Sequence, residues 1–140
     1  MANLHVEIVA AEGHIHSGEA SMVFAPAAMG EVGIAPRHAP LLTTMKPGTV
    51  RVQTTSGEEL AFFVGGGILE VQPHVVIVLA DTAMRGEDAD EAAAEAAKRE
   101  AEEKLKGASD KMDVAKAQAE LVEAAARLEF VKKMKTPAHR

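Results

Sequence analysis

The chain contains no cysteine, tryptophan or tyrosine, and only four of its 140 residues are phenylalanine. Without cysteine it can form no disulfide and no thiolate metal site, which suits a reducing compartment. The scarcity of aromatic side chains removes the large, rigid groups that commonly line small-molecule pockets. These absences exclude cysteine chemistry and give little support to a small-molecule pocket.

Long hydrophobic runs and an excess of basic residues are absent as well. The longest apolar run, Val75 to Ala80, has the length of a strand and is far below the ~18 residues of a membrane-spanning helix. The formal net charge of −6 argues against general binding to the phosphates of nucleic acids. Residues 1–5 carry no basic segment of the kind that begins a signal peptide. We therefore expect a soluble, cytoplasmic protein.

The N-terminal part of the chain has the pattern of a β protein. Leu4, Val6 and Ile8 recur with the period of two that is typical of a half-buried strand. Turn signals follow at short intervals, at Glu12-Gly13, Ser17-Gly18, Met29-Gly30, Pro47-Gly48, Ser56-Gly57, Gly65–Gly67 and Gln72-Pro73. Many short strands with turns at this spacing predict an antiparallel sandwich or barrel rather than βαβ units.

No motif in this part predicts catalysis. His14 and His16 would share one face of a strand, but no third metal ligand is suggested by the spacing, so we expect surface histidines. Gly65–Gly67 lacks the Lys-Ser/Thr of a phosphate-binding loop and is more typical of a bulge or a close backbone approach. We predict no catalytic residue, no metal site and no cofactor.

The β pattern then gives way to a helical one. Asp88, followed three residues later by Glu91, has the pattern of a capping box that starts a helix. From Ala89 to Lys106 the chain is rich in Ala, Glu and Lys, which are strong helix formers. We therefore predict a β domain over residues 1–86 and a helical unit over residues 87–140.

Two helices are expected in the second unit. Gly107 ends the first as its C′ residue, and Asp110 starts the second, which stops before Pro137. The second helix repeats apolar residues with heptad spacing, at Val114, Ala117, Leu121, Ala124, Leu128 and Val131. The first offers mostly alanine to this seam. Since a buried methylene contributes ~0.8 kcal/mol against ~1.5–3 for a whole Leu or Phe side chain, the hairpin should pack closely but weakly.

Residues 30–48, GEVGIAPRHAPLLTTMKPG, form the most individual segment. Pro36, Pro40 and Pro47 fix φ and remove hydrogen-bond donors, so much of this segment is not expected to be a central strand. Its apolar residues are either tucked under a sheet or offered to a partner. The pattern alone does not choose between these two.

Three segments carry a resemblance to a known family. They are residues 30–48, GGILEVQP at Gly66 to Pro73 and VLADTAMRG at Val78 to Gly86, and their order and separation also match. In them the chain resembles the epsilon subunit of bacterial F-type ATP synthases, and the similarity covers nearly the whole length. The resemblance implies an α+β fold, a flattened ten-stranded antiparallel β-sandwich followed by a two-helix antiparallel hairpin.

A role and partners are implied by the same resemblance. Members of this family are non-catalytic central-stalk subunits that couple proton-driven rotation to ATP synthesis and inhibit ATP hydrolysis through their C-terminal helices. The implied partners are the gamma subunit, the ring of c subunits and the alpha/beta hexamer, and the implied place is the cytoplasmic side of the bacterial inner membrane. The family's ring-facing positions match Glu31, His38 and Leu42. Where the family usually has a glycine, the chain has Arg37, which should disfavour a tight turn.

The helices carry two further family features. Some members bind ATP through an Ile/Leu-Asp-x-x-Arg-Ala motif at the start of the first helix. The chain retains the acid as Asp90 but has Ala89 and Ala93 where the motif has its apolar residue and its arginine. Without that cation the charge-assisted hydrogen bonds to phosphate are lost, so nucleotide binding should be very weak or absent.

Basic residues gather near the end of the second helix. Arg127, Lys132 and Lys133 are candidates for contact with the alpha/beta hexamer, although cations there also suit the helix dipole. The main alternative to the rotor role is a stand-alone β-sandwich binding module with a helical oligomerisation tail. That alternative predicts self-association in place of a gamma-like partner.

Overall fold

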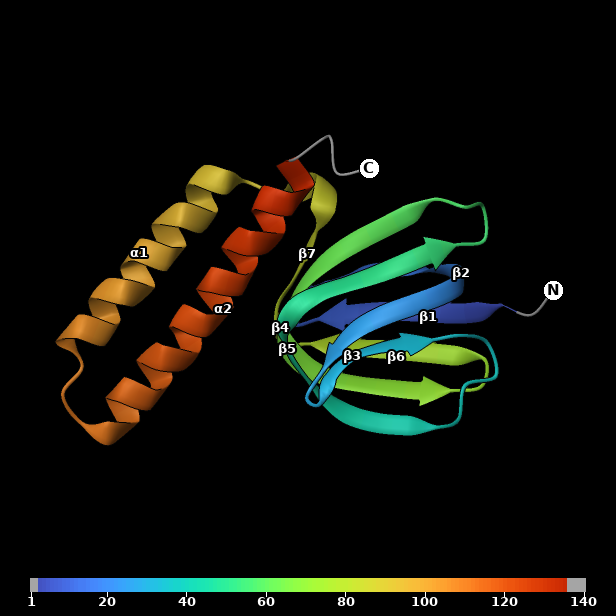
Figure 1. The fold of residues 1–140 in the computed structure, drawn as a ribbon, viewed down its shortest axis with the longest axis horizontal. Coiled ribbons are helices and arrows are strands. Elements are labelled where there is room, and N and C mark those ends of the chain that lie inside the picture. The colour runs from blue at the N-terminus through green and yellow to red at the C-terminus, as the bar shows by residue number, and fades with distance from the viewer. Residues whose placement is uncertain (1–2, 136–140) are drawn as a thin grey trace. The chain divides into compact units, whose positions relative to one another are not determined.

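The computed structural model describes residues 3–135. The strands are β1 (Leu4–Ala10), β2 (Gly13–Ala27), β3 (Gly30–Ile34), β4 (Leu41–Thr54), β5 (Glu59–Gln72), β6 (Val75–Ala80) and β7 (Ala83–Arg85). A 3₁₀ turn, η1 (Gly86–Asp88), leads to the helices α1 (Glu91–Gly107) and α2 (Lys111–Lys135) (Figure 1). The chain divides into two compact units, Met1–Gly86 and Glu87–Arg140. The predicted fold class, a β domain followed by two helices, is confirmed.

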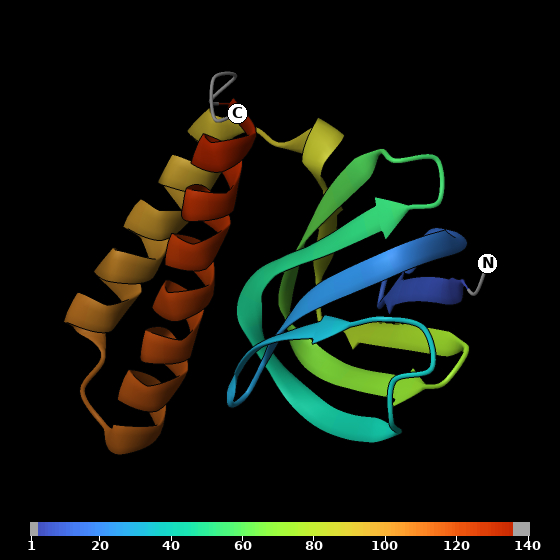
Figure 2. The same ribbon diagram turned by 45° about the vertical axis from the view of Figure 1, so that its right-hand side comes forward.

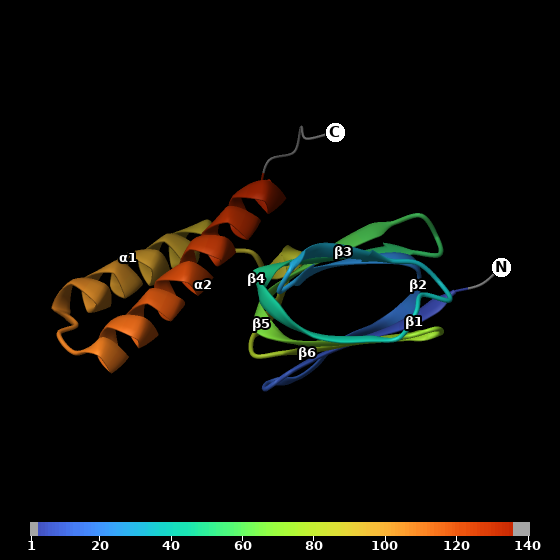
Figure 3. The same ribbon diagram turned by 60° about the horizontal axis from the view of Figure 1, so that its bottom comes forward.

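The strands of the first unit form one sheet that curls into two layers around a core (Figure 3). The strand order is β1-β6-β5-β4-β2-β3, with β7 beside β5, and β1 pairs with β2 as well. All pairings between the described strands are antiparallel except that of β1 with β6. With a hydrogen-bonded neighbour on each side, β1 closes the sheet and removes an exposed edge.

Three of these strands are unusually long. β2, β4 and β5 contain 15, 14 and 14 residues. Ser17-Gly18, Pro47-Gly48 and Gly65–Gly67, which look like turns between strands in the sequence, lie inside these three strands. Dividing each long strand at that point gives the expected number of about ten, whereas the described residues form seven continuous strands.

Residues 41–48 belong to a central strand, contrary to the expectation from their prolines. β4 pairs with β5 on one side and with β2 on the other. Pro47 is tolerated because the register of β2 against β4 is interrupted between Phe24 and Ala27, so the ladder has a gap near its missing N–H. Met45 is buried whereas Leu42 is exposed. The segment therefore both completes the core and presents a side chain outward.

The core of the sandwich is mainly aliphatic. Its buried residues are Leu4, Val6, Ile8, Ala10, Ala20, Val23, Ala25, Ile34, Met45, Val50, Val52, Phe62, Val64, Leu69, Val71, Val76, Val78 and Ala80. The predicted alternation in β1 is confirmed, because Leu4, Val6 and Ile8 are all fully buried. Each fully buried aliphatic side chain of this size contributes ~1.5–3 kcal/mol.

The helical unit is an antiparallel hairpin in which α1 and α2 lie side by side (Figure 2). The predicted seam is buried on α2 at Ala117, Ala124, Leu128 and Val131, and the buried residues of α1 are Ala94 and Ala101. Most of these seam residues are alanine, which offers little apolar area, although α2 also buries the larger side chain of Phe130. Within residues 3–135, no helix combines the length and the apolar character needed to cross a membrane.

Helix α1 begins at Asp90 rather than at Asp88. The Asp90 carboxylate accepts a hydrogen bond from the backbone N–H of Ala93, with Oδ1 and N 3.2 Å apart. Asp88 is the last residue of η1. The predicted capping box is therefore wrong, because the 3₁₀ turn after β7 delays the start of the α-helix by one short turn.

In the connection between the helices, the end of α1 differs from the prediction, whereas the start of α2 agrees with it. Gly107 is the last residue of α1, not a left-handed residue after it, and the N–H of Ala108 donates to the carbonyl of Leu105. Asp110 starts α2 as predicted, because its carboxylate accepts a hydrogen bond from the N–H of Asp113 at 2.8 Å.

Candidate functional site

Glu31 lies on β3, and a neighbouring arginine holds its carboxylate. Arg51 of β4 donates to Glu31 Oε2 and to Glu59 Oε2, each at 3.3 Å. The same guanidinium lies 4.2 Å from the ring centroid of Phe24, a cation–π contact that orients its plane. The Glu31 side chain is 54% exposed. It is therefore accessible to a partner, but that partner must compete with Arg51.

His38 lies in the loop between β3 and β4, which makes a tight turn. The His38 N–H donates to the Ala35 carbonyl at 3.1 Å, and the Arg37 N–H donates to the Pro73 carbonyl at 2.8 Å. Arg37 has a φ of 69°, the left-handed conformation that favours glycine. The expectation that Arg37 prevents a tight turn is wrong: the turn forms with Arg37 in the left-handed conformation, because these hydrogen bonds hold the backbone in place. The His38 ring donates from Nδ1 to the Ala39 carbonyl at 2.7 Å.

Leu42 follows this loop at the start of β4, and its side chain is 71% exposed. Met29, in the turn between β2 and β3, is 97% exposed. The N–H of Ala28 donates to the Thr44 carbonyl at 2.9 Å, so this turn is joined to β4 two residues from Leu42. Met29 is thus a further candidate for contact, and it begins the loop, Met29 to Glu31, that the resemblance to epsilon subunits implies is near the c-ring.

Glu31, His38 and Leu42 lie in chain order on one segment formed by β3, the loop and the start of β4 (Figure 1). In the part of the chain that the structure describes, no hydrogen bond or ion pair joins any two of them. We name residues 29–42 the β3–β4 segment. It presents apolar, acidic and imidazole groups separately, as a contact surface does, rather than gathering them as a catalytic site does.

A second exposed apolar pair lies on the outer face of β5 and β6. Ile68 and Leu79 pair across the two strands and are 44% and 45% exposed. The sequence carries a signal for this pair, because Val75 to Ala80 has no polar residue and so must place apolar side chains on both faces of β6. The pair extends the apolar surface available on the sandwich.

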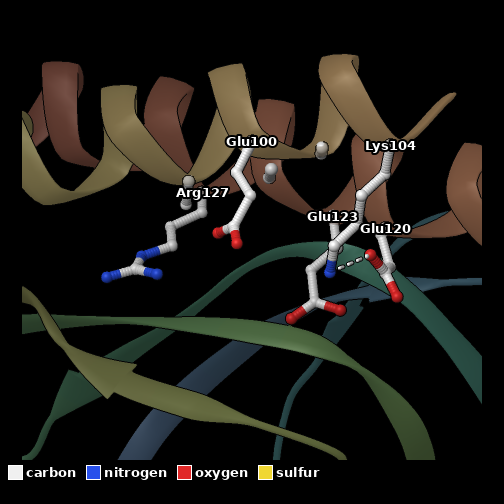
Figure 4. Close-up of a pocket in the computed structure, with 8 residues that line it drawn as sticks. Glu100, Lys104, Glu120, Glu123 and Arg127 are labelled. Atoms are coloured by element: carbon white, nitrogen blue, oxygen red, sulfur yellow. Dashed lines mark hydrogen bonds and ion pairs between the residues drawn. The ribbon is translucent and has the colours of Figure 1, made fainter. Parts of the chain in front are cut away.

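The hairpin has a groove of about 200 Å³ between its helices (Figure 4). Besides alanines, it is lined by five charged side chains, namely Glu100, Lys104, Glu120, Glu123 and Arg127. Lys104 of α1 donates to Glu120 Oε1 of α2 at 3.3 Å, an ion pair across the hairpin. Because both partners are largely exposed, such a pair contributes about 0.2–1 kcal/mol.

The three predicted basic residues lie in two environments. Arg127 is half-buried and extends along the groove on the same side as Glu100 (Figure 4). Lys132 and Lys133 are exposed near the end of α2. The fold thus separates Arg127 from the two lysines. Reversing the charge of Arg127 would therefore alter the hairpin's own groove, which Lys132 and Lys133 do not line.

His14 and His16 do not share a face as predicted. The register of β1 against β2 shifts beside them, and this β-bulge breaks the alternation of the strand. The His16 ring packs against Phe62 with centroids 5.1 Å apart, whereas His14 pairs with Glu7. Within residues 3–135, no group of three His, Cys, Asp or Glu residues is arranged to hold a metal ion.

Both units of the chain match profiles of one protein family. The ATP synthase delta/epsilon chain β-sandwich domain matches residues 3–86, and the delta/epsilon chain long α-helix domain matches residues 87–132. The chain belongs to the ATP synthase delta/epsilon chain family. The resemblance seen in the sequence to epsilon subunits is thereby confirmed.

Curated epsilon chains are close relatives along the whole chain. The ATP synthase epsilon chain of Nitrosococcus oceani is 59% identical over 132 residues, which cover 94% of each chain. That of Alkalilimnicola ehrlichii is 57% identical over 140 residues and the full length of both. A chain in the cryo-EM structure of the Euglena gracilis mitochondrial ATP synthase has a TM-score of 0.77 at 19% identity, covering 90% of this chain and 79% of that one. The last likeness shows a shared fold.

Proposed function

We propose that this chain is the epsilon subunit in the rotor of a bacterial F-type ATP synthase, coupling proton-driven rotation to ATP synthesis and restraining ATP hydrolysis. The observation that carries the proposal is the match of both units to the epsilon chain family, with relatives of more than 50% identity along the full length. In this role the chain is not catalytic by itself. It is a peripheral subunit on the cytoplasmic side of the inner membrane.

The sandwich binds the gamma subunit and meets the c-ring through the β3–β4 segment. The backbone of this segment is held rigidly, because Arg37 is hydrogen-bonded to Pro73, Leu41 and Leu42 pair with β5, and β3 pairs with β2. Leu42 and Met29 offer apolar area, and Glu31 offers a carboxylate already oriented by Arg51. A rigid surface of this kind can transmit torque without loss to local rearrangement.

Reconstitution of an epsilon-depleted synthase tests this surface. Addition of the chain should restore ATP-driven proton pumping in membrane vesicles, with the gamma subunit retained on a tagged copy. Leu42→Glu should reduce pumping per ATP hydrolysed, whereas Met112→Glu, at an 83% exposed position of the hairpin, should not. Self-association of the chain without capture of gamma would instead support the stand-alone binding module.

Restraint of hydrolysis rests on the hairpin. Its seam is mostly alanine, and the ion pair between Lys104 and Glu120 is exposed. Both features favour a hairpin that can open while α2 stays helical. We propose that α2 then enters the alpha/beta hexamer, where Lys132 and Lys133 meet acidic groups. Loss of one partner of such a buried pair costs about 2–5 kcal/mol, largely as faster dissociation.

Charge reversal at the two lysines tests the inhibitory role. The double variant Lys132→Glu and Lys133→Glu should raise ATP hydrolysis by the assembled enzyme, and the matched Gln variants should raise it less at equal helicity. Arg127→Glu belongs in a separate variant, because Arg127 lines the hairpin's own groove. Equal hydrolysis by all these variants and the unmodified enzyme would rule out the basic contact.

The hairpin also lacks the features of a nucleotide site. The Asp90 carboxylate is engaged in capping α1, and Ala93 stands where the family's nucleotide motif has arginine. Three of the five charged groups along the groove are carboxylates, and Lys104 is paired with one of them. An anionic triphosphate would be repelled there. We therefore propose regulation by the hairpin without nucleotide binding, and a subunit without a cofactor.

A further inference from the structure

A cluster of ionisable side chains joins β1 to β2 on the outer face of the sandwich. It consists of His5 and Glu7 from β1 and His14, Ser17 and Glu19 from β2. In the strand register, His5 lies opposite Glu19 and Glu7 lies opposite Ser17. We name these five residues the β1–β2 cluster. None of them belongs to the surfaces assigned above.

The ring of His5 contacts a carboxylate at each nitrogen. Its Nδ1 lies 2.8 Å from Glu19 Oε2, and its Nε2 lies 2.5 Å from Glu7 Oε2. A carboxylate only accepts hydrogen bonds, and a neutral imidazole has only one N–H to donate. A neutral His5 would therefore turn a nitrogen lone pair toward a carboxylate oxygen. Both contacts are hydrogen bonds only when His5 carries a second proton.

Glu7 is the acceptor shared by the whole cluster. It accepts hydrogen bonds from His14 and His5, and from the Ser17 hydroxyl at 2.8 Å. These bonds, that of His14 foremost, lower the pKa of Glu7 to about 2. The bonds to Glu19 and then to Glu7 raise the pKa of His5 above 6.5. The two carboxylates thus hold a cation between neighbouring strands.

Among residues 3–135, the side chains that flank His5 on β6 carry no charge. On β6, its register partner Val75 and the next outward residue, Ile77, are apolar. The His74 carbonyl accepts the backbone N–H of His5 at 2.9 Å. His16 is on the other face of β2, and burial, followed by the charge of Arg85, lowers its pKa. His16 therefore stays neutral near neutral pH and leaves His5 as the cation between the carboxylates.

We propose that the folded sandwich binds a proton at His5 and that this proton clamps β1 to β2. Loss of the proton leaves Glu7 and Glu19 on adjacent strands without the cation between them, so repulsion and a missing hydrogen bond weaken the joint. Because β1 also closes the sheet against β6, the clamp helps to stabilise the closed form of the whole sandwich. The rotor sandwich therefore carries a pH-responsive element independent of the helical hairpin.

The sign of the effect follows from the two groups. Since the pKa of His5 is raised from 6.5, its contribution is complete below that pH and is lost as the pH rises through the higher folded value. Since the pKa of Glu7 is lowered from 4.5 to about 2, its contribution is present above 4.5 and is lost as the pH falls through about 2. The cluster stabilises the fold most between these limits, from about pH 4.5 to 6.5.

Nitrogen NMR of the imidazole rings in the full-length protein tests the proposal directly. With EDTA present throughout, more than half of the His5 rings should carry protons on both nitrogens at pH 6.5, where an ordinary histidine is about half protonated. The titration midpoint of His5 should lie above 6.5. A titration midpoint of His5 at or below 6.5 would overturn the proposal, and this measurement on the unmodified chain requires no variant to fold.

Two matched carboxylate variants test whether Glu19 is responsible for the raised pKa of His5. Glu19→Gln removes a charge but keeps an acceptor, and it should lower the His5 midpoint toward 6.5. Glu59→Gln, at an exposed carboxylate that pairs with Arg51 instead, should leave the midpoint unchanged. The unmodified chain should lose thermal stability between pH 6.5 and 8.5 more steeply than the Glu19→Gln chain. Equal midpoints and equal slopes in the two chains would contradict the clamp.

Discussion

At Gly67 the backbone of β5 lies so close to β6 that a single added methyl group should damage the sandwich. Its φ is +138°, and a Cβ built there would lie 2.1 Å from the Leu79 carbonyl oxygen and 2.9 Å from the Ala80 Cα. Holding a non-glycine residue in such a conformation costs about 1–3 kcal/mol. The overlap with backbone adds about 1–3 kcal/mol. Gly67→Ala should therefore lose about 2–6 kcal/mol of the ~5–15 typical of a domain.

Gly13→Ala is the matched control, because it separates strain from overlap. Gly13 also has a positive φ, +128°, but nothing lies within 4 Å of its Cβ position. The Gly13→Ala variant should therefore lose only the stability that corresponds to backbone strain, about 1–3 kcal/mol. Because the chain has no Trp or Tyr to report unfolding by fluorescence, urea unfolding of the full chain can be followed by the NMR methyl signals of Ile8 and Val64.

With a urea m-value of about 1–3 kcal/mol/M, the additional loss in Gly67→Ala lowers its unfolding midpoint by a measurable fraction of a molar unit or more relative to Gly13→Ala. The helical unit serves as an internal reference, because Gly67 is in the other compact unit. Equal unfolding midpoints for the two variants would refute the reasoning. They would show that β6 moves to accommodate the added methyl group without a loss of stability.

Three further predictions concern the division of the chain and its caps. A fragment of residues 1–86 should unfold cooperatively with a β-type circular dichroism spectrum, because it forms a compact unit, and an unfolded fragment would mean that the helices complete its core. Asp90→Ala should destabilise α1 by about 1 kcal/mol in amide exchange, whereas Asp88→Ala should have little effect; the reverse order would contradict the cap. Millimolar ATP should leave the melting temperature unchanged, although a ligand at a hundred times its Kd would add ~2.7 kcal/mol. A rise in the melting temperature with ATP that is absent in Asp90→Ala would show that the hairpin does bind nucleotide.

The fold class could be predicted because it depends on local pattern. The alternation of Leu4, Val6 and Ile8 places one face of β1 in the core, and the heptad spacing on α2 places Leu128 and Val131 in the seam. Asp110 has a single clear role as a cap, since no second acidic residue precedes it in the short connection. The structure agrees with these three local signals.

The features that the sequence did not predict depend on which strands become neighbours, and a local sequence pattern does not contain this information. Pro47-Gly48 looks like a turn but is a bend in β4, because the interrupted register of β2 accommodates it. The pairing of Arg51 with Glu31 and of His5 with Glu19 joins residues that are distant in sequence. The helix start was ambiguous, since two aspartates precede the alanine-rich run and only the η1 turn selects between them.

The parallel pairing of β1 with β6 has a consequence for synthesis. His5 pairs with Val75, so β1 acquires that neighbour only after β6 has been synthesised. At about 5–20 residues per second, this is a wait of about 4–14 s. During that time β1 has an apolar face and one unpaired edge, even if the hairpin with β2 has formed. The nascent chain is therefore most open to aggregation before residue 80 emerges, and β1 is among the last strands of the sandwich to have both edges paired.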